Sequence, residues 1–154
     1  MPARRVSGEV KQYSGKMNTS DFTQTILFPV TPEQVYAALM TAEAHSRFTG
    51  SDAAIRDEVG ADFSVFDGYA HGRNVELIPG QKIVQTWRAN EENWPADHFS
   101  EVVFDLREHP DGAELTFIQT GVPEEYADAI NQGWHEYYWE PMLDYFNAPP
   151  SDAS

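Results

Sequence analysis

The chain has 154 residues, of which 41% are hydrophobic and 20 are aromatic (4 Trp, 7 Tyr and 9 Phe). This composition suits one domain with a real core and excludes disorder over the whole length. The 25 acidic and 10 basic residues give a net charge of −15, which disfavours nucleic acids and anionic membranes as partners. The absence of cysteine excludes disulfides and thiolate chemistry.

The two ends of the chain differ from the middle. Residues 1–16 hold four basic side chains, one acidic side chain and few large apolar groups, which predicts a flexible tail. No apolar segment follows the arginine pair of this tail, and the longest apolar run, residues 35–40, is too short to span a membrane. We therefore expect a cytoplasmic protein with one domain over residues 17–146 and a disordered C-terminus over residues 147–154.

The first half of the domain predicts one strand and two short helices. Apolar residues alternate between positions 22 and 30, so they share one face of an extended segment. Thr31-Pro32-Glu33-Gln34 then combines a capping residue, a proline at the first helical position and a capping-box glutamine. This signature predicts a small helical pair near residues 32–49.

The middle of the chain is rich in strand and turn signals. Asp67-Gly68, Pro79-Gly80 and Pro110-Asp111-Gly112 each separate two segments of β-type sequence, as hairpin turns do. Apolar residues alternate with polar ones on either side of the last turn, which is typical of an antiparallel sheet with one covered face. We expect about seven strands.

The last part of the domain predicts one long helix over residues 123–146. Pro141 should kink this helix or loosen its last turns, and Gly133 weakens its middle. The resulting fold class is α+β, a helix-grip arrangement in which a curved antiparallel sheet wraps a long C-terminal helix. The apolar stripe that should face the sheet consists of Ala127, Ile130, Trp134, Tyr138 and Met142.

Aromatic side chains, rather than catalytic groups, dominate the predicted interface between sheet and helix. They either fill a solid core or enclose a cavity, and a ligand cavity would measure roughly 300–1,000 Å³. Strand register is not fixed by the sequence, so the sequence does not fix which strand residues face the helix. The residues expected to line the cavity are Phe48, Phe63, Phe66, Trp87, Phe104, Phe117, Trp134, Tyr138 and Met142.

The motifs that could carry catalysis or bind a metal all favour structural interpretations. The five histidines show no paired ligand spacing, and no glycine-rich phosphate loop is present. Asp97-His98 with Glu101 suits a solvated loop, and Glu136 with Glu140 suits a water-facing helical stripe. We expect no metal, no cofactor and no assigned catalytic residue.

Six segments together resemble a known family. They are residues 63–69, 76–80, 83–88, 94–99, 119–123 and 132–141. In this order, from about residue 21 to residue 146, they resemble the START-like (SRPBCC) superfamily. Within it, the chain is most similar to domains homologous to the C-terminal domain of the activator of the 90-kDa heat-shock protein ATPase.

This resemblance implies a helix-grip fold with an internal apolar cavity or groove, and a link to the heat-shock chaperone. The activators carry a separate N-terminal domain for which this chain has no room, so weak ATPase stimulation is the most we expect. Residues 89–93 also form a longer segment than the family pattern has. The family's functional residues are poorly defined, so none is transferred.

Three functions follow as hypotheses. The first is a non-enzymatic domain that binds an apolar small molecule in its cavity. The alternative is a co-chaperone-like activator of the heat-shock chaperone ATPase. The second alternative is a cyclase- or hydratase-like enzyme, which needs a polar pair in the cavity, and the sequence offers His71, Gln85 and Glu101 as candidates.

Overall fold

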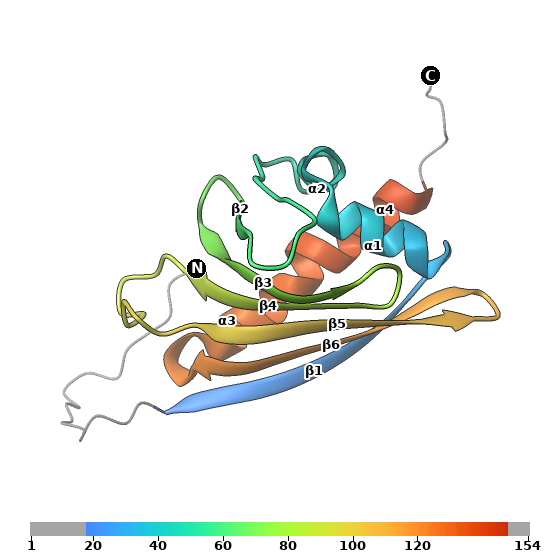
Figure 1. Ribbon diagram of the computed structural model, residues 1–154. Helices are drawn as coiled ribbons and strands as arrows, with labels where there is room; N and C mark the ends of the chain where they lie inside the picture. Colours follow the sequence, from blue (N-terminus) through green and yellow to red (C-terminus); the bar gives the residue numbers. More distant parts are fainter. Residues whose placement is uncertain (1–17, 148–154) are drawn as a thin grey trace.

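The computed structural model describes residues 18–147. One antiparallel sheet of six strands, in the order β1-β6-β5-β4-β3-β2, curves around a helical segment at the C-terminal end (Figure 1). The predicted α+β helix-grip fold is confirmed, with six strands instead of about seven. Between the helices and the second strand, residues 51–61 make a single isolated bridge, from Ala54 to Ser64. The predicted tail over residues 1–16 lies outside the described residues, as do residues 148–154.

The first strand and the two short helices form as predicted. Strand β1 (Thr19–Phe28) pairs with β6 and turns alternate side chains toward the helix. Helix α1 (Pro32–Met40) begins with a complete capping box, in which Thr31 Oγ1 accepts from the Gln34 N–H and Gln34 Oε1 accepts from the Thr31 N–H, both over 3.1 Å. Helix α2 (Ala42–Thr49) follows directly and contacts the helical residues 140–147.

Three of the four connections between the other five strands are the predicted turns. The five strands are β2 (Asp62–Val65), β3 (Ala70–Ile78), β4 (Lys82–Ala89), β5 (Ser100–His109) and β6 (Gly112–Pro123). Each consecutive pair from β2 to β6 is antiparallel, so these five strands form a meander, and β1 pairs with β6, which leaves β1 and β2 at the free edges. Gly72 on β3 allows a close approach to β4, because a Cβ there would lie 1.8 Å from the Thr86 carbonyl oxygen.

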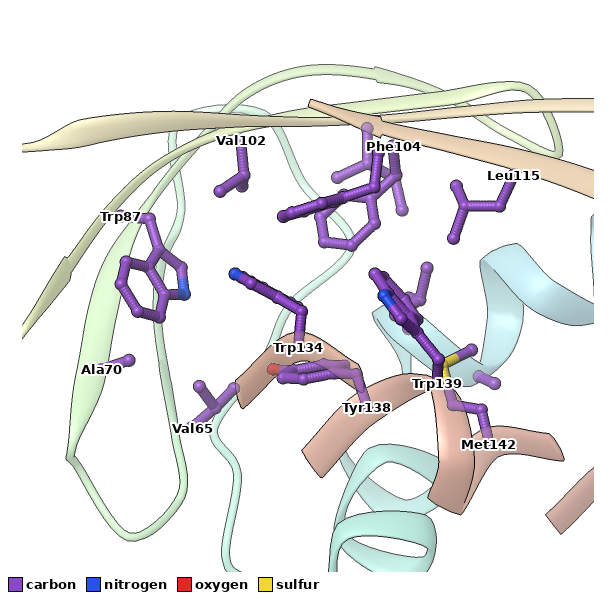
Figure 2. Packing of buried hydrophobic residues seen from close by; sticks show 14 of the residues in the cluster. Val65, Ala70, Trp87, Val102, Phe104, Leu115, Trp134, Tyr138, Trp139 and Met142 are labelled. Carbon is purple, nitrogen blue, oxygen red and sulfur yellow. The ribbon is translucent and has the colours of Figure 1, made fainter. Parts of the chain in front are cut away.

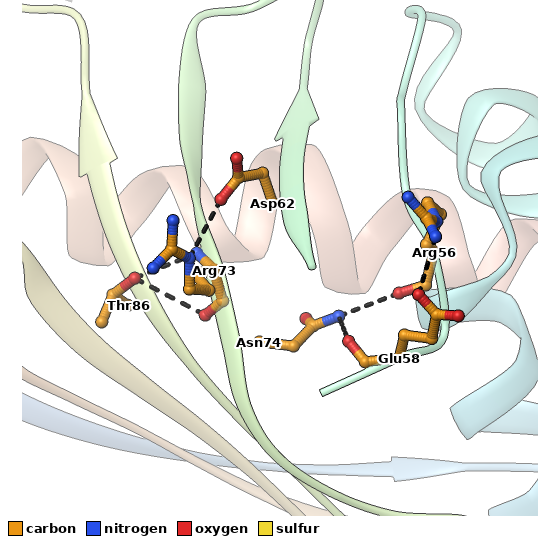
Figure 3. Close-up of polar contacts among 6 residues, drawn as sticks. All are labelled: Arg56, Glu58, Asp62, Arg73, Asn74 and Thr86. Carbon is orange, nitrogen blue, oxygen red and sulfur yellow. Dashed lines mark hydrogen bonds and ion pairs between the residues drawn. The ribbon is translucent and has the colours of Figure 1, made fainter. Parts of the chain in front are cut away.

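Asn74 fastens the loop over residues 51–61 to the sheet (Figure 3). Its Nδ2 donates to the carbonyl oxygens of Arg56 and Glu58 over 2.9 and 3.0 Å, and the side chain is fully buried. The β3–β4 ladder shifts register directly after Asn74, which is typical of a β-bulge. The same view shows the exposed ion pair between Arg73 and Asp62, at 3.1 Å.

The C-terminal helix is continuous but changes its winding. Helix α3 (Glu124–Trp134) passes into a π-helical turn, η1 (His135–Trp139), and then into α4 (Glu140–Asn147). Within the turn, the Glu140 N–H donates to the His135 carbonyl oxygen, five residues back. The wider turn directly precedes Pro141, whose ring would clash with a carbonyl of the preceding α-helical turn. The predicted irregularity at Pro141 therefore takes the form of a π-turn.

Candidate functional site

Aromatic rings fill most of the space between the sheet and the helix (Figure 2). The ring of Trp134 lies 4.3 Å from that of Phe117 and 4.4 Å from that of Tyr138, measured between ring centroids. The void that remains inside, lined mainly by apolar groups of α1, β2, β4 and the helix, measures only about 20 Å³. This volume is about that of one water molecule and far below that of a ligand cavity.

The π-turn explains why the helix presents so many aromatic rings to the sheet. Tyr138 lies four residues after Trp134, as expected for one face of an α-helix, but Trp139 is also buried, with 2% of its surface exposed. The wider π-turn brings residues five apart into line, and the rings of Trp134 and Trp139 are stacked at 22° with centroids 5.7 Å apart. Sequence reasoning based on α-helical spacing missed Trp139.

Two buried glutamines hold these tryptophans. Gln119 on β6 accepts the indole N–H of Trp134 over 2.7 Å, and Gln24 on β1 accepts that of Trp139 over 2.6 Å. Gln24 also donates to both the backbone and the side chain of Asn131. Both glutamines occupy inward positions of their strands, and a polar residue within an otherwise apolar alternation was the signal that could have identified them.

A separate hollow lies at one side of the filled core, between the β2–β3 turn and the helix. We name it the aromatic cleft, and its volume is about 250 Å³. It is predominantly apolar. Its lining consists of Phe66, Tyr69, Trp87, Ala129, Ile130, Gly133, Trp134, Tyr137 and Tyr138.

The nine residues predicted to line a cavity lie in four different places. Phe66, Trp87, Trp134 and Tyr138 line the aromatic cleft. Phe63 and Phe104 face the small inner void, and Phe117 and Met142 are fully buried in the core. Phe48 lies on the other side of the helix, where it packs against Tyr145. Tyr69, Tyr137 and Gly133 belong to the cleft and were not among the predicted residues.

The mouth of the cleft is formed by two aromatic side chains. Phe66, in the β2–β3 turn, has a φ of 53°, a left-handed conformation that is strained for a bulky residue. Its ring lies 6.1 Å from that of Tyr137, which is 51% exposed. Tyr69, next to this pair, donates its hydroxyl to Glu91 over 2.5 Å. Strained turns and exposed aromatic rings are features of ligand clamps.

Gly133 leaves space on the helical wall of the cleft. A Cβ at this position would meet nothing closer than the Tyr137 ring, at 3.6 Å, which is an ordinary contact. The glycine is therefore not required by helix packing, although it costs about 1 kcal/mol relative to alanine within a helix. Its effect in this structure is to keep the cleft open.

His45 and Tyr138 form a buried polar pair beside the cleft. Their Nε2 and hydroxyl oxygen are 2.9 Å apart, and His45 Nδ1 has no hydrogen-bond partner among the described residues. Burial lowers the pKa of His45 to about 4 and raises the pKa of Tyr138 well above its usual range. His45 is therefore neutral at pH 7, as an uncharged part of the core. Sequence reasoning could not pair residues that are 93 positions apart.

The polar residues considered for an enzyme are not brought together. Gln85 faces the core and donates to Asn74 Oδ1 over 3.0 Å. His71 and Glu101 lie on the other face of the sheet, since their pairing partners there are Arg88 and Thr86.

The other two candidate groups lie in a loop and beside an open groove. His98 Nε2 lies 2.6 Å from the Gly121 carbonyl oxygen in a loop that Arg88 fastens by bonds to carbonyl oxygens. Glu136 and Glu140 line an open groove beside Arg47.

Within residues 18–147 no group of three or more His, Asp or Glu side chains is placed to hold a metal ion. In the same residues, no helix is both long and apolar enough to cross a membrane.

Comparisons with known proteins agree with this architecture. The mouse activator of 90 kDa heat shock protein ATPase homolog 1 is 28% identical over 138 residues, which cover 90% of this chain and 40% of the relative. The mouse homolog 2 is 33% identical over 118 residues, covering 77% of this chain and 35% of the relative. The chain thus spans about 40% or less of the length of these curated relatives.

Solved structures share the fold. The crystal structure of an HSP90 activator from Plasmodium falciparum has a TM-score of 0.72 at 22% identity and covers 87% of this chain and 99% of that one. The solution structure of the Aha1 dimer from Colwellia psychrerythraea has a TM-score of 0.70 at 19% identity and covers 82% and 96%. The family profile described as "Activator of Hsp90 ATPase homolog 1-like protein" matches residues 29–147. The resemblance seen in the sequence is therefore confirmed, and the chain belongs to this family.

Proposed function

We propose that this protein acts on the 90-kDa heat-shock chaperone as a co-chaperone-like activator of its ATPase. The family match carries the proposal, because it extends from the end of β1 through all of α4. The filled interior supports it as well. A void of about 20 Å³ leaves the core no room for a ligand, so a function exerted through the surface fits this domain better. The proposal places the protein in the cytoplasm with its chaperone.

The relatives are more than twice as long as the matched region, so the activity of this region alone must be measured. The experiment is steady-state ATP turnover by the chaperone of the same organism, with increasing amounts of this protein. A specific chaperone inhibitor gives the background from other ATPases. We expect turnover to rise up to a stoichiometric ratio, with binding visible in calorimetry. Unchanged turnover together with no binding would refute the proposal.

Exposed apolar side chains offer a way to locate the contact. Val75, Phe99 and Tyr137 are large and at least 41% exposed, and they lie on β3, in the loop before β5 and on η1. Each can be replaced by serine without disturbing the core. If activation works through the surface, one replacement should weaken binding to the chaperone while the other two serve as matched controls.

A second candidate function is the binding of an apolar small molecule in the aromatic cleft. The observation that favours it is the cleft itself, with a strained Phe66 at its mouth and an open space beside Gly133. This function does not depend on the chaperone. Native mass spectrometry of the purified protein tests it, since a bound compound would add a defined mass that disappears on denaturation.

A further inference from the structure

Trp87 differs from the other tryptophans in its hydrogen bonding. All four tryptophans of the chain lie within the described residues, and three of them donate the indole N–H to an oxygen. Those acceptors are the His98 carbonyl for Trp94 at 2.9 Å, Gln119 Oε1 for Trp134 at 2.7 Å and Gln24 Oε1 for Trp139 at 2.6 Å. Trp87 is 5% exposed as a residue and its Nε1 has no hydrogen-bond acceptor among residues 18–147, but the nitrogen is not enclosed, because the one enclosed polar side-chain atom without a partner in these residues is His45 Nδ1.

An indole nitrogen can only donate, and a donor that is open to a cleft can bond either to water or to a bound molecule. Trp87 forms part of the aromatic cleft, and Figure 2 shows its nitrogen edge turned toward Trp134 across the space between sheet and helix. The cleft thus holds a donor whose acceptor is not supplied by the described protein. A bound molecule with an acceptor atom would take this bond in place of water.

The walls of the cleft favour a flat molecule. Phe66 and Tyr69 approach from the β2–β3 turn, while Trp134, Tyr137 and Tyr138 approach from the helix. Aromatic faces on both sides stack best on another planar ring system. Gly133 adds no side chain to the wall, so the gap between the rings stays open.

The charged groups in and around the cleft restrict the class of ligand further. The cleft is lined by no carboxylate and no basic side chain, so it offers no partner to either an anion or a cation. Glu91, which accepts from the hydroxyl of the lining residue Tyr69, adds a negative charge beside the cleft. With a net charge of −15 on the whole chain, an anionic ligand is repelled.

We infer that the aromatic cleft binds a neutral, planar aromatic compound whose carbonyl oxygen accepts the indole N–H of Trp87. This inference rests on the second candidate function, small-molecule binding in the cleft, and names its ligand class. Stacking between the two walls supplies most of the affinity, and the Trp87 N–H selects a compound with an acceptor over one without.

Fluorene and 9-fluorenone are suitable probes because both are flat, neutral and three-ringed, and only fluorenone has a carbonyl oxygen. Both are titrated into protein labelled with ¹⁵N at the tryptophan side chains, followed by the four indole N–H signals in NMR. We expect fluorenone to bind about 3- to 10-fold more tightly than fluorene, as one net hydrogen bond allows. We expect the Trp87 signal, assigned by its absence in Trp87→Phe, to move furthest toward a hydrogen-bonded position.

Two variants test separately the role of the Trp87 N–H and the need for open space beside Gly133. Trp87→Phe keeps a ring but removes the donor, so fluorene and fluorenone should bind it equally well. Gly133→Leu places a side chain in the cleft and should abolish binding of both probes, while Gly133→Ala serves as the matched control. The melting temperature and the NMR spectrum of each variant establish that it is folded.

The outcomes are distinct. If neither probe binds the parent protein, small-molecule binding in the cleft is refuted together with the inference. If both bind equally well and Trp87→Phe changes nothing, the cleft binds aromatic compounds but the role of Trp87 is wrong. If the carboxylate analogue 9-fluorenone-2-carboxylate binds as tightly as fluorenone, the restriction to neutral ligands is wrong. None of these results bears on activation of the chaperone.

Discussion

Trp134 and Gln119 share a buried hydrogen bond of 2.7 Å that joins the C-terminal helix to strand β6. The bond belongs to a chain, because Gln119 Nε2 donates to Ser100 Oγ over 3.0 Å and Ser100 Oγ donates to the Trp87 carbonyl oxygen over 2.8 Å. Three strands and the helix are thus connected through polar groups inside an otherwise apolar core. Networks of this kind are costly when one member is removed.

Gln119→Leu is expected to lower the free energy of unfolding by about 1–3 kcal/mol, because it leaves the buried N–H of Trp134 without an acceptor. Urea denaturation measures the change. The double variant Gln119→Leu, Trp134→Phe removes both partners and should lose less than the sum of the two single changes. Strict additivity would mean that the bond contributes nothing specific.

Gly133→Ala should raise the free energy of unfolding by about 0.5–1 kcal/mol, since alanine is the better helix former and the added methyl has room. Gly72→Ala is the matched control on the sheet. There the Cβ would lie 1.8 Å from the Thr86 carbonyl oxygen, so this variant should be strongly destabilised. Thermal unfolding of both variants compares them, and a destabilised Gly133→Ala would show that the helix needs the glycine.

Local signals in the sequence were sufficient for most of the fold. The Thr31–Gln34 capping box and the turn at Asp67-Gly68 depend on residues a few positions apart, and both form as predicted. The order of elements and their alternation then leave few ways to cover the apolar face of the sheet. The number of strands was predicted less well, since about seven were expected and the sheet has six.

The site was harder to predict because it depends on long-range register. The π-turn shifts Trp139 inward, and no local pattern distinguishes such a turn from an α-helical one. Which rings surround the cleft depends on how the β2–β3 turn meets the helix, and Phe66 and Tyr137 are 71 positions apart in the sequence. The aromatic composition therefore indicated the kind of site, but not whether its rings enclose a cavity or fill it.

Asn74→Ala should loosen the loop over residues 51–61, because it removes the bonds to the carbonyl oxygens of Arg56 and Glu58. Amide hydrogen exchange in this loop is expected to become about tenfold faster or more, while exchange in β5 and β6 changes less. Arg73→Gln is the matched control, since it breaks only the exposed ion pair with Asp62, which contributes about 0–1 kcal/mol. Equal effects of the two variants would contradict the role assigned to Asn74.

The buried His45 should make the stability of the fold depend on pH. Its pKa is about 4 in the folded protein and 6.5 when exposed, so the unfolded chain binds the proton more tightly. Stability from this group is therefore complete above about pH 6.5 and is lost as the pH falls toward 4. The difference between the two pKa values corresponds to about 3 kcal/mol in the free energy of unfolding. About 2 kcal/mol of it is lost between pH 7 and pH 5.

Carboxylates titrate in part of the same range, so the contribution of His45 must be obtained by difference. His45→Gln cannot take up a proton here, and its free energy of unfolding should fall less than that of the parent between pH 7 and pH 5. Urea denaturation at both pH values gives the change in the free energy of unfolding for the parent and for the variant. If the parent and the variant lose stability in parallel, the acid sensitivity arises elsewhere and His45 is not held neutral by burial.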